Sequence, residues 1–129
     1  KLLRESDRDV LTVVAAGVTL HEALNAYEEL RQEGISIRLI DSYSIKPIDA
    51  ETLGRAARDT GIILTVEDHF AEGGLGEAVR SALTELAVPV HSLAIRKKPK
   101  SGKPQELLDY EEISRKAIVA RVKSLIQMI

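Results

Sequence analysis

The sequence predicts a layered α/β domain with a parallel β-sheet. Short runs rich in β-branched residues alternate, from start to finish, with longer segments whose apolar residues recur at helical spacing. The linkers between them are short, so successive strands must be joined by right-handed helical crossovers. The chain has 129 residues, of which 44% are hydrophobic. That length suits one ordinary domain, and we expect a single domain over residues 1–129.

Four segments are expected to be strands: 10–16, 35–40, 62–66 and 88–95. The first is almost wholly apolar and ends at Gly17, as expected of a strand that is covered on both faces. Pro89 interrupts the last of them early, which places that strand near an edge of the sheet.

Four helices are expected between and after these strands. Thr19 and Glu22 have the spacing of a capping box at the start of the first helix, and Gly34 closes that helix. The other helices are expected to begin at Asp49, to cover 75–86, and to cover 111–126 after a separate helical turn at 105–108.

Composition excludes several classes of protein. There is no cysteine, so disulfides and thiolate metal sites are absent. No apolar run approaches the ~20 residues of a membrane span, and no membrane partner is expected. The formal net charge is −2, and the basic run 96–103 contains no aromatic residue on which bases could stack. We therefore interpret that run as a solvated loop and expect no nucleic-acid partner.

The loop after the third strand has the most chemically versatile side chains. Ligands of open α/β sheets lie beyond the carboxyl ends of the strands, where Glu67, Asp68 and His69 emerge together. Two carboxylates and an imidazole are candidates for acid–base chemistry. The alternative, which we favour, is that the carboxylates pair with a basic loop or cap a helix. His21, His69 and His91 lack the spacing of a metal site, so no metal is expected.

Three glycines, Gly73, Gly74 and Gly76, follow this loop at the start of a helix. Helix N–H groups at such a place could hold an anion. The same glycines would equally allow the helix to pack closely against another chain. The candidate site is therefore an anion-binding or interface loop, with no catalytic or cofactor-binding residue assigned.

Five motifs add a family resemblance to this pattern. They occur in order along the chain: GVTL at 17–20, SIKPID at 44–49, TVEDH at 65–69, EGGLGEAV at 72–79 and SGKP at 101–104. Together they resemble the C-terminal domain of transketolase over residues 10 to about 126. Deoxyxylulose-phosphate synthases and the beta chains of 2-oxoacid dehydrogenases keep the GG-x-G but not the VEDH and SGKP motifs around it.

The resemblance implies a three-layer α/β/α fold whose mostly parallel sheet has five strands, one of them antiparallel. The fifth strand would lie at 42–45 or at the start of the chain. It also implies a cytoplasmic, homodimeric parent enzyme of the pentose phosphate pathway. That enzyme moves a two-carbon ketol unit between sugar phosphates with thiamine diphosphate and a divalent cation, Mg or Ca.

In that family the cofactor lies between the two preceding domains, and its diphosphate–metal motif is absent from this sequence. We therefore expect no cofactor in this chain and no activity of the chain alone. Because it begins at Lys1 rather than Met, we expect a fragment of a longer protein. The alternatives are a free-standing module for small organic anions, an enzyme using Glu67, Asp68 and His69, and the C-terminal domain of another thiamine-diphosphate enzyme.

Overall fold

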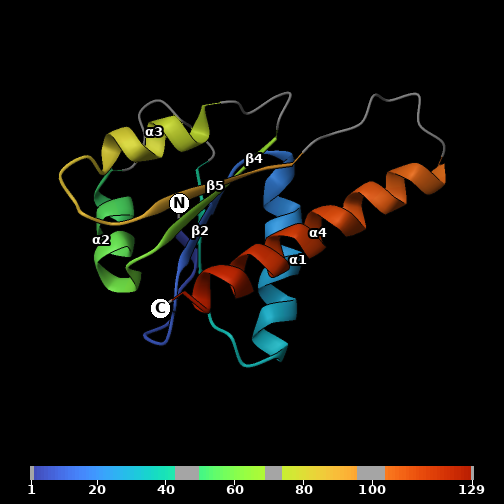
Figure 1. Ribbon diagram of the computed structural model, residues 1–129, viewed down its shortest axis with the longest axis horizontal. Coiled ribbons are helices and arrows are strands. Elements are labelled where there is room, and N and C mark those ends of the chain that lie inside the picture. The colour runs from blue at the N-terminus through green and yellow to red at the C-terminus, as the bar shows by residue number, and fades with distance from the viewer. Residues whose placement is uncertain (1, 43–49, 69–73, 96–103, 129) are drawn as a thin grey trace.

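The computed structural model describes residues 2–42, 50–68, 74–95 and 104–128 (Figure 1). These residues form five strands and four helices, in the order β1 (Leu2–Arg4), β2 (Thr12–Ala15), α1 (Val18–Gln32), β3 (Arg38–Asp41), α2 (Ala50–Thr60), β4 (Ile63–Asp68), α3 (Leu75–Ala82), β5 (Val90–Ile95) and α4 (Pro104–Ile126).

The five strands form one sheet in the order β1-β3-β2-β4-β5. Strands β3, β2, β4 and β5 are parallel to one another, with Val14 of β2 opposite both Ile40 of β3 and Thr65 of β4. Strand β1 pairs antiparallel with β3. The mostly parallel, five-stranded sheet is thus confirmed, and the fifth strand is the one at the start of the chain. The placement of the 88–95 strand near an edge is also confirmed, because β5 ends the sheet.

Helices cover both faces of the sheet, which gives the three layers (Figure 1). Val13 and Ala15 of β2 belong to the hydrophobic cluster that joins the sheet to α1 and α4. Val14, between them in sequence, belongs to a second cluster with α2 and α3. Alternating side chains of one strand therefore enter opposite layers, which explains why nearly every residue of this strand is apolar.

The expected capping box at Thr19 and Glu22 is wrong. Gly17, with φ of +62°, is the N-cap of α1, and that cap has no side-chain hydrogen bond. The Thr19 hydroxyl donates to the carbonyls of Ala16, at 2.8 Å, and of Val66, at 3.1 Å. Thr19 is therefore turned toward the sheet, where it ties the start of α1 to the end of β4.

Two helix boundaries also differ from expectation. Helix α3 ends at Ala82, before the expected residue 86. Helix α4 is continuous from Pro104 to Ile126, although a separate turn was expected at 105–108. After Pro104, which suits the first turn of a helix, the sequence of α4 contains no proline or glycine that would break it. The expected start of α2 at Asp49 lies outside the described residues. None of the helices in the described ranges is long and apolar enough to span a membrane.

Candidate functional site

The candidate loop starts where the sequence predicts it, at the carboxyl end of β4, an inner strand of the sheet. Glu67 and Asp68 are the last two residues of β4, and Gly74 and Gly76 lie at the start of α3. His69 and Gly73 are outside the described residues, as are the Asp68 side chain and the basic run 96–103. The structure thus brings together one carboxylate, that of Glu67, and two of the three glycines.

Glu67 holds the start of α3 directly. The Gly74 N–H donates a hydrogen bond to Oε1 of Glu67 over 3.0 Å. Gly74 is the N-cap of α3 and has φ of +102°, a conformation that side chains with a Cβ rarely adopt. A carboxylate at a helix N-terminus is favourable because it accepts an otherwise unpaired N–H and faces the positive end of the helix dipole.

Gly76 is buried against polar side chains of β4, β5 and α3. A Cβ added at Gly76 would lie 2.5 Å from Oγ of Ser92 and 3.1 Å from both Oε2 of Glu67 and a guanidinium nitrogen of Arg80. We call Thr65, Glu67, Arg80 and Ser92 the α3 polar cluster. Only a glycine at position 76 lets α3 approach this cluster so closely.

Hydrogen bonds connect three members of the α3 polar cluster, Thr65, Ser92 and Arg80. The hydroxyls of Thr65 and Ser92 are 2.8 Å apart across neighbouring strands. Arg80 donates to Oγ of Ser92 and to the backbone carbonyl of Val90, each at 3.1 Å. These groups largely satisfy one another, as polar groups between a helix and a sheet must. The arrangement fixes α3 on the sheet.

The described residues do not fit a bound diphosphate at this place. An anion at the start of α3 would have to displace the Glu67 carboxylate from the Gly74 N–H and would meet its negative charge. Across the described parts of the chain, no group of three or more His, Asp and Glu side chains could hold a metal ion.

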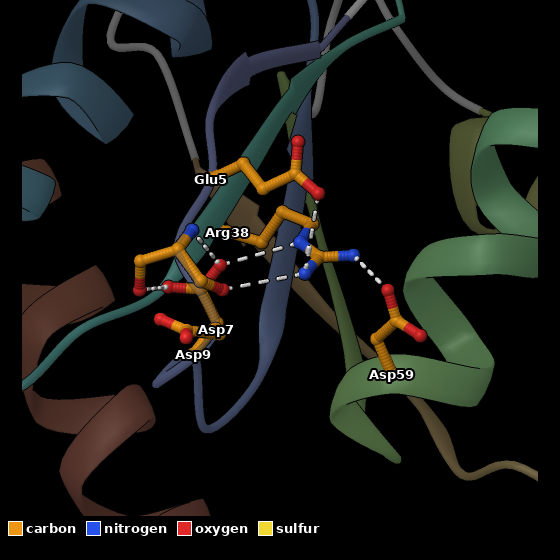
Figure 2. Close-up of a pocket in the computed structure, with 6 residues that line it drawn as sticks. Glu5, Asp7, Asp9, Arg38 and Asp59 are labelled. Carbon is orange, nitrogen blue, oxygen red and sulfur yellow. Dashed lines mark hydrogen bonds and ion pairs between the residues drawn. The ribbon is translucent and has the colours of Figure 1, made fainter.

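A second polar region, at the opposite end of the strands, was not predicted from the sequence. Figure 2 shows the Arg38 guanidinium between Asp9 and Asp59. These residues line a hollow with a volume of about 600 Å³. Arg38 begins β3 and its side chain is only 4% exposed, while that of Asp9, before β2, is 2% exposed. The hollow is lined by Glu5, Ser6, Asp7, Asp9, Arg38 and Asp59.

Arg38 joins three separate segments of the chain. It donates to Oδ2 of Asp9 over 3.2 Å, to Oδ2 of Asp59 in α2 over 2.9 Å and to the Ser6 carbonyl over 3.4 Å. A carboxylate oxygen of Glu5 is 3.6 Å away. Buried charges normally require such partners. We therefore interpret these residues as a structural ion-pair network.

The network also shifts the pKa values of Arg38 and Asp59. Burial opposes the charged form of Arg38, but hydrogen bonds to Asp59 and Asp9 outweigh it and raise the pKa of the guanidinium. The hydrogen bond from Arg38 is the main cause that lowers the pKa of the Asp59 carboxyl. Both shifts favour the ion pair over neutral partners.

One sequence signal could have revealed this network. Asp9 directly precedes one expected strand, and Arg38 is a charged residue at a polar position near the start of the next. The amino ends of parallel strands lie at the same edge of a sheet. A negative charge near the start of one strand and a positive charge near the start of its neighbour therefore predict a contact. Asp59 and Glu5 carry no comparable signal, because α2 and β1 reach this edge only through tertiary packing.

Together, the fold and the site define a three-layer α/β domain whose described polar groups at both ends of the sheet serve packing. Comparison with known proteins identifies it further. The family described as "Transketolase, C-terminal domain" matches residues 1–118. The chain therefore belongs to the transketolase C-terminal domain family.

Individual relatives agree with this assignment. Over 128 residues, 98% of the chain, it is 53% identical to transketolase-like protein 2 of Mus musculus and 51% identical to transketolase of Homo sapiens. It spans about a fifth of the length of each of these proteins, 20% in both cases. A solved structure described as "Split gene transketolase, inactive beta4 tetramer" is 37% identical, with a TM-score of 0.79 over 98% of this chain and 42% of that chain.

Proposed function

We propose that residues 1–129 form a single, non-catalytic domain of a transketolase, and that this domain serves assembly of the enzyme. In this proposal the parent enzyme transfers a two-carbon ketol unit between sugar phosphates in the cytoplasm, in the pentose phosphate pathway. Thiamine diphosphate and a divalent cation, Mg or Ca, bind to the preceding domains of a homodimer. The preceding domains and the second subunit are therefore the partners of this chain.

The match to one family over residues 1–118, in a chain that spans a fifth of full-length relatives, carries the proposal. A domain that forms so small a part of an enzyme acts in the context of the other domains. The split-gene structure described as an inactive tetramer includes a region similar to this chain, which supports a role in assembly.

The chemistry at the candidate loop supports the same role. The Glu67 carboxylate is engaged by the Gly74 N–H, and the hydroxyls of Thr65 and Ser92 are engaged with each other. These contacts fix the end of β4 and the start of α3, the two described ends of the candidate loop, as an interface at this place requires. The acid–base role of Glu67, Asp68 and His69 stays an untested alternative.

Calorimetric titration of the 129-residue chain with thiamine diphosphate and magnesium tests the non-catalytic part of the proposal. We expect no saturable heat up to millimolar cofactor, because the described residues offer neither a metal-ligand group nor an open anion site. Full-length human transketolase under the same buffer serves as the positive control. A parallel titration with inorganic diphosphate addresses the anion-module alternative. Saturable micromolar binding of either compound by the chain alone would contradict the proposal.

A further inference from the structure

Residues 2–9, which we call the strap, pass along the outer edge of the sheet and around its amino-terminal end. They comprise β1 and the turn that precedes β2. We infer that Arg38 holds this strap on the sheet. We also infer that residues 2–9 detach from the sheet together, at a lower free-energy cost than unfolding of the rest of the domain. Opening would leave the outer edge of β3 without its strand neighbour.

The strap has few other attachments to the sheet. Strand β1 has three residues and pairs only with β3, and its register shifts between Leu2 and Arg4. Leu2 and Leu3 are only partly buried, one against each hydrophobic cluster. Short edge strands with little buried apolar surface are the parts of a fold that open at the lowest free-energy cost.

The turn of the strap is shaped by Asp9 and then connected to Arg38. Oδ2 of Asp9 accepts the Ser6 N–H at 2.8 Å, and Oδ1 accepts the Ser6 hydroxyl at 2.7 Å. The same Asp9 carboxylate accepts Nε of Arg38. Because Arg38 also reaches the Ser6 carbonyl and Asp59 of α2, one side chain joins the turn, β3 and a helix (Figure 2).

Among the described residues, the ion pair of the strap that does not involve Arg38 is exposed. Glu5 contacts Arg55 of α2 at 2.7 Å, but their side chains are 39% and 51% exposed. Exposed pairs contribute little, since water screens them and both side chains lose conformational freedom. Arg4 of the strap also lies over the ring of Tyr27 in α1, 5.5 Å from its centroid. The Arg38–Asp9 pair is the almost fully buried charged contact, so we expect it to contribute most to the attachment.

Amide hydrogen exchange followed by mass spectrometry tests this inference. In Arg38→Met at neutral pH, we expect peptides of the strap to exchange at least about tenfold faster than in the wild type. Peptides covering β2 and β4, whose amides exchange mainly through global unfolding, should also exchange faster than in the wild type but should remain slower than the strap. Arg31→Met is the matched control, because the ion pair that Arg31 forms in the described part of the chain is with exposed Glu28 on α1. This variant should leave strap exchange unchanged.

Asp59→Asn provides a second variant in case Arg38→Met does not fold. Asp59 is 47% exposed and forms one arm of the network, so this variant should fold and loosen the strap more mildly. A strap that exchanges faster than β2 and β4 in the wild type, and faster still in either folded variant, supports the inference. A strap as protected as β4 in the wild type and in both folded variants would overturn it.

Discussion

Replacing Arg38 by methionine is expected to lower the free energy of unfolding by about 3–5 kcal/mol, the usual cost of breaking a buried ion pair. Methionine roughly keeps the length of the side chain but leaves the Asp9 carboxylate, only 2% exposed, without its cationic partner. Thermal unfolding should therefore occur more than about 10 °C lower than in the wild type. Arg31→Met, which breaks an exposed pair, should shift the midpoint little.

A double variant distinguishes two causes of the destabilisation: the unpaired charge of Asp9 and the lost packing of the Arg38 side chain. Asp9→Asn removes the charge but can keep hydrogen bonds to Ser6. Adding Arg38→Met to Asp9→Asn should then cost clearly less than adding it to the wild type, because no buried anion is left unpaired. An equal cost in both backgrounds would contradict the ion-pair explanation and point to packing alone.

The same network makes the free energy of unfolding depend on pH in the acid range. Because Arg38 lowers the pKa of Asp59, the folded carboxyl binds protons less readily than in the unfolded chain, whose reference pKa is 3.8. Its contribution is present above that pKa and is lost as pH falls through the lowered folded value. The thermal unfolding midpoint should accordingly fall as pH drops below the reference value of the Asp59 carboxyl, and Asp59→Asn should reduce this dependence; a melting series over pH measures both.

Gly76→Ala is expected to destabilise the domain by about 2 kcal/mol, although alanine is normally the better helix residue. The new Cβ would lie 2.5 Å from Oγ of Ser92, a hydroxyl held by Thr65 and Arg80. Chemical denaturation with urea measures the change. The clash outweighs the gain in helix propensity because Ser92 has a short side chain that cannot move aside without losing its hydrogen bonds.

Ser92→Ala distinguishes this clash from a general intolerance of glycine replacement. Removing the hydroxyl should recover part of the stability lost in Gly76→Ala. Gly74→Ala is the comparison, because a Cβ there meets nothing within 4 Å and its cost comes from φ of +102°. Ser92→Ala should therefore not rescue Gly74→Ala. Equal rescue of both variants, or of neither, would contradict the close approach inferred at Gly76.

Much of the fold was predictable because its periodic segments are strongly apolar. The run 10–16 has the pattern of a strand buried on both faces, and β2 lies there with side chains in both clusters. Strand β1 was not predictable from local pattern, since three residues show no periodicity and pair with β3, more than thirty residues away along the chain. Only the family resemblance indicated a fifth strand.

The side-chain contacts were harder to predict than the elements. Thr19 and Glu22 match a capping box in sequence, yet the threonine hydroxyl reaches the Val66 carbonyl of a neighbouring strand instead. The glycines near position 75 were recognised, but the reason for Gly76 depends on Ser92 and Arg80, which approach it only in the folded sheet. Such contacts are tertiary, and local spacing does not contain them.

A domain exchange tests the proposed role in assembly most directly. Human transketolase lacking the region that matches this chain would be compared with the same enzyme carrying residues 1–129 in its place. The shared 51% identity makes the exchange conservative. We predict that the truncated enzyme loses dimerisation and ketol transfer together, and that the chimera regains both. A truncated enzyme that remains dimeric and fully active, or one that dimerises and binds cofactor normally yet lacks turnover, would contradict a role of this domain in assembly.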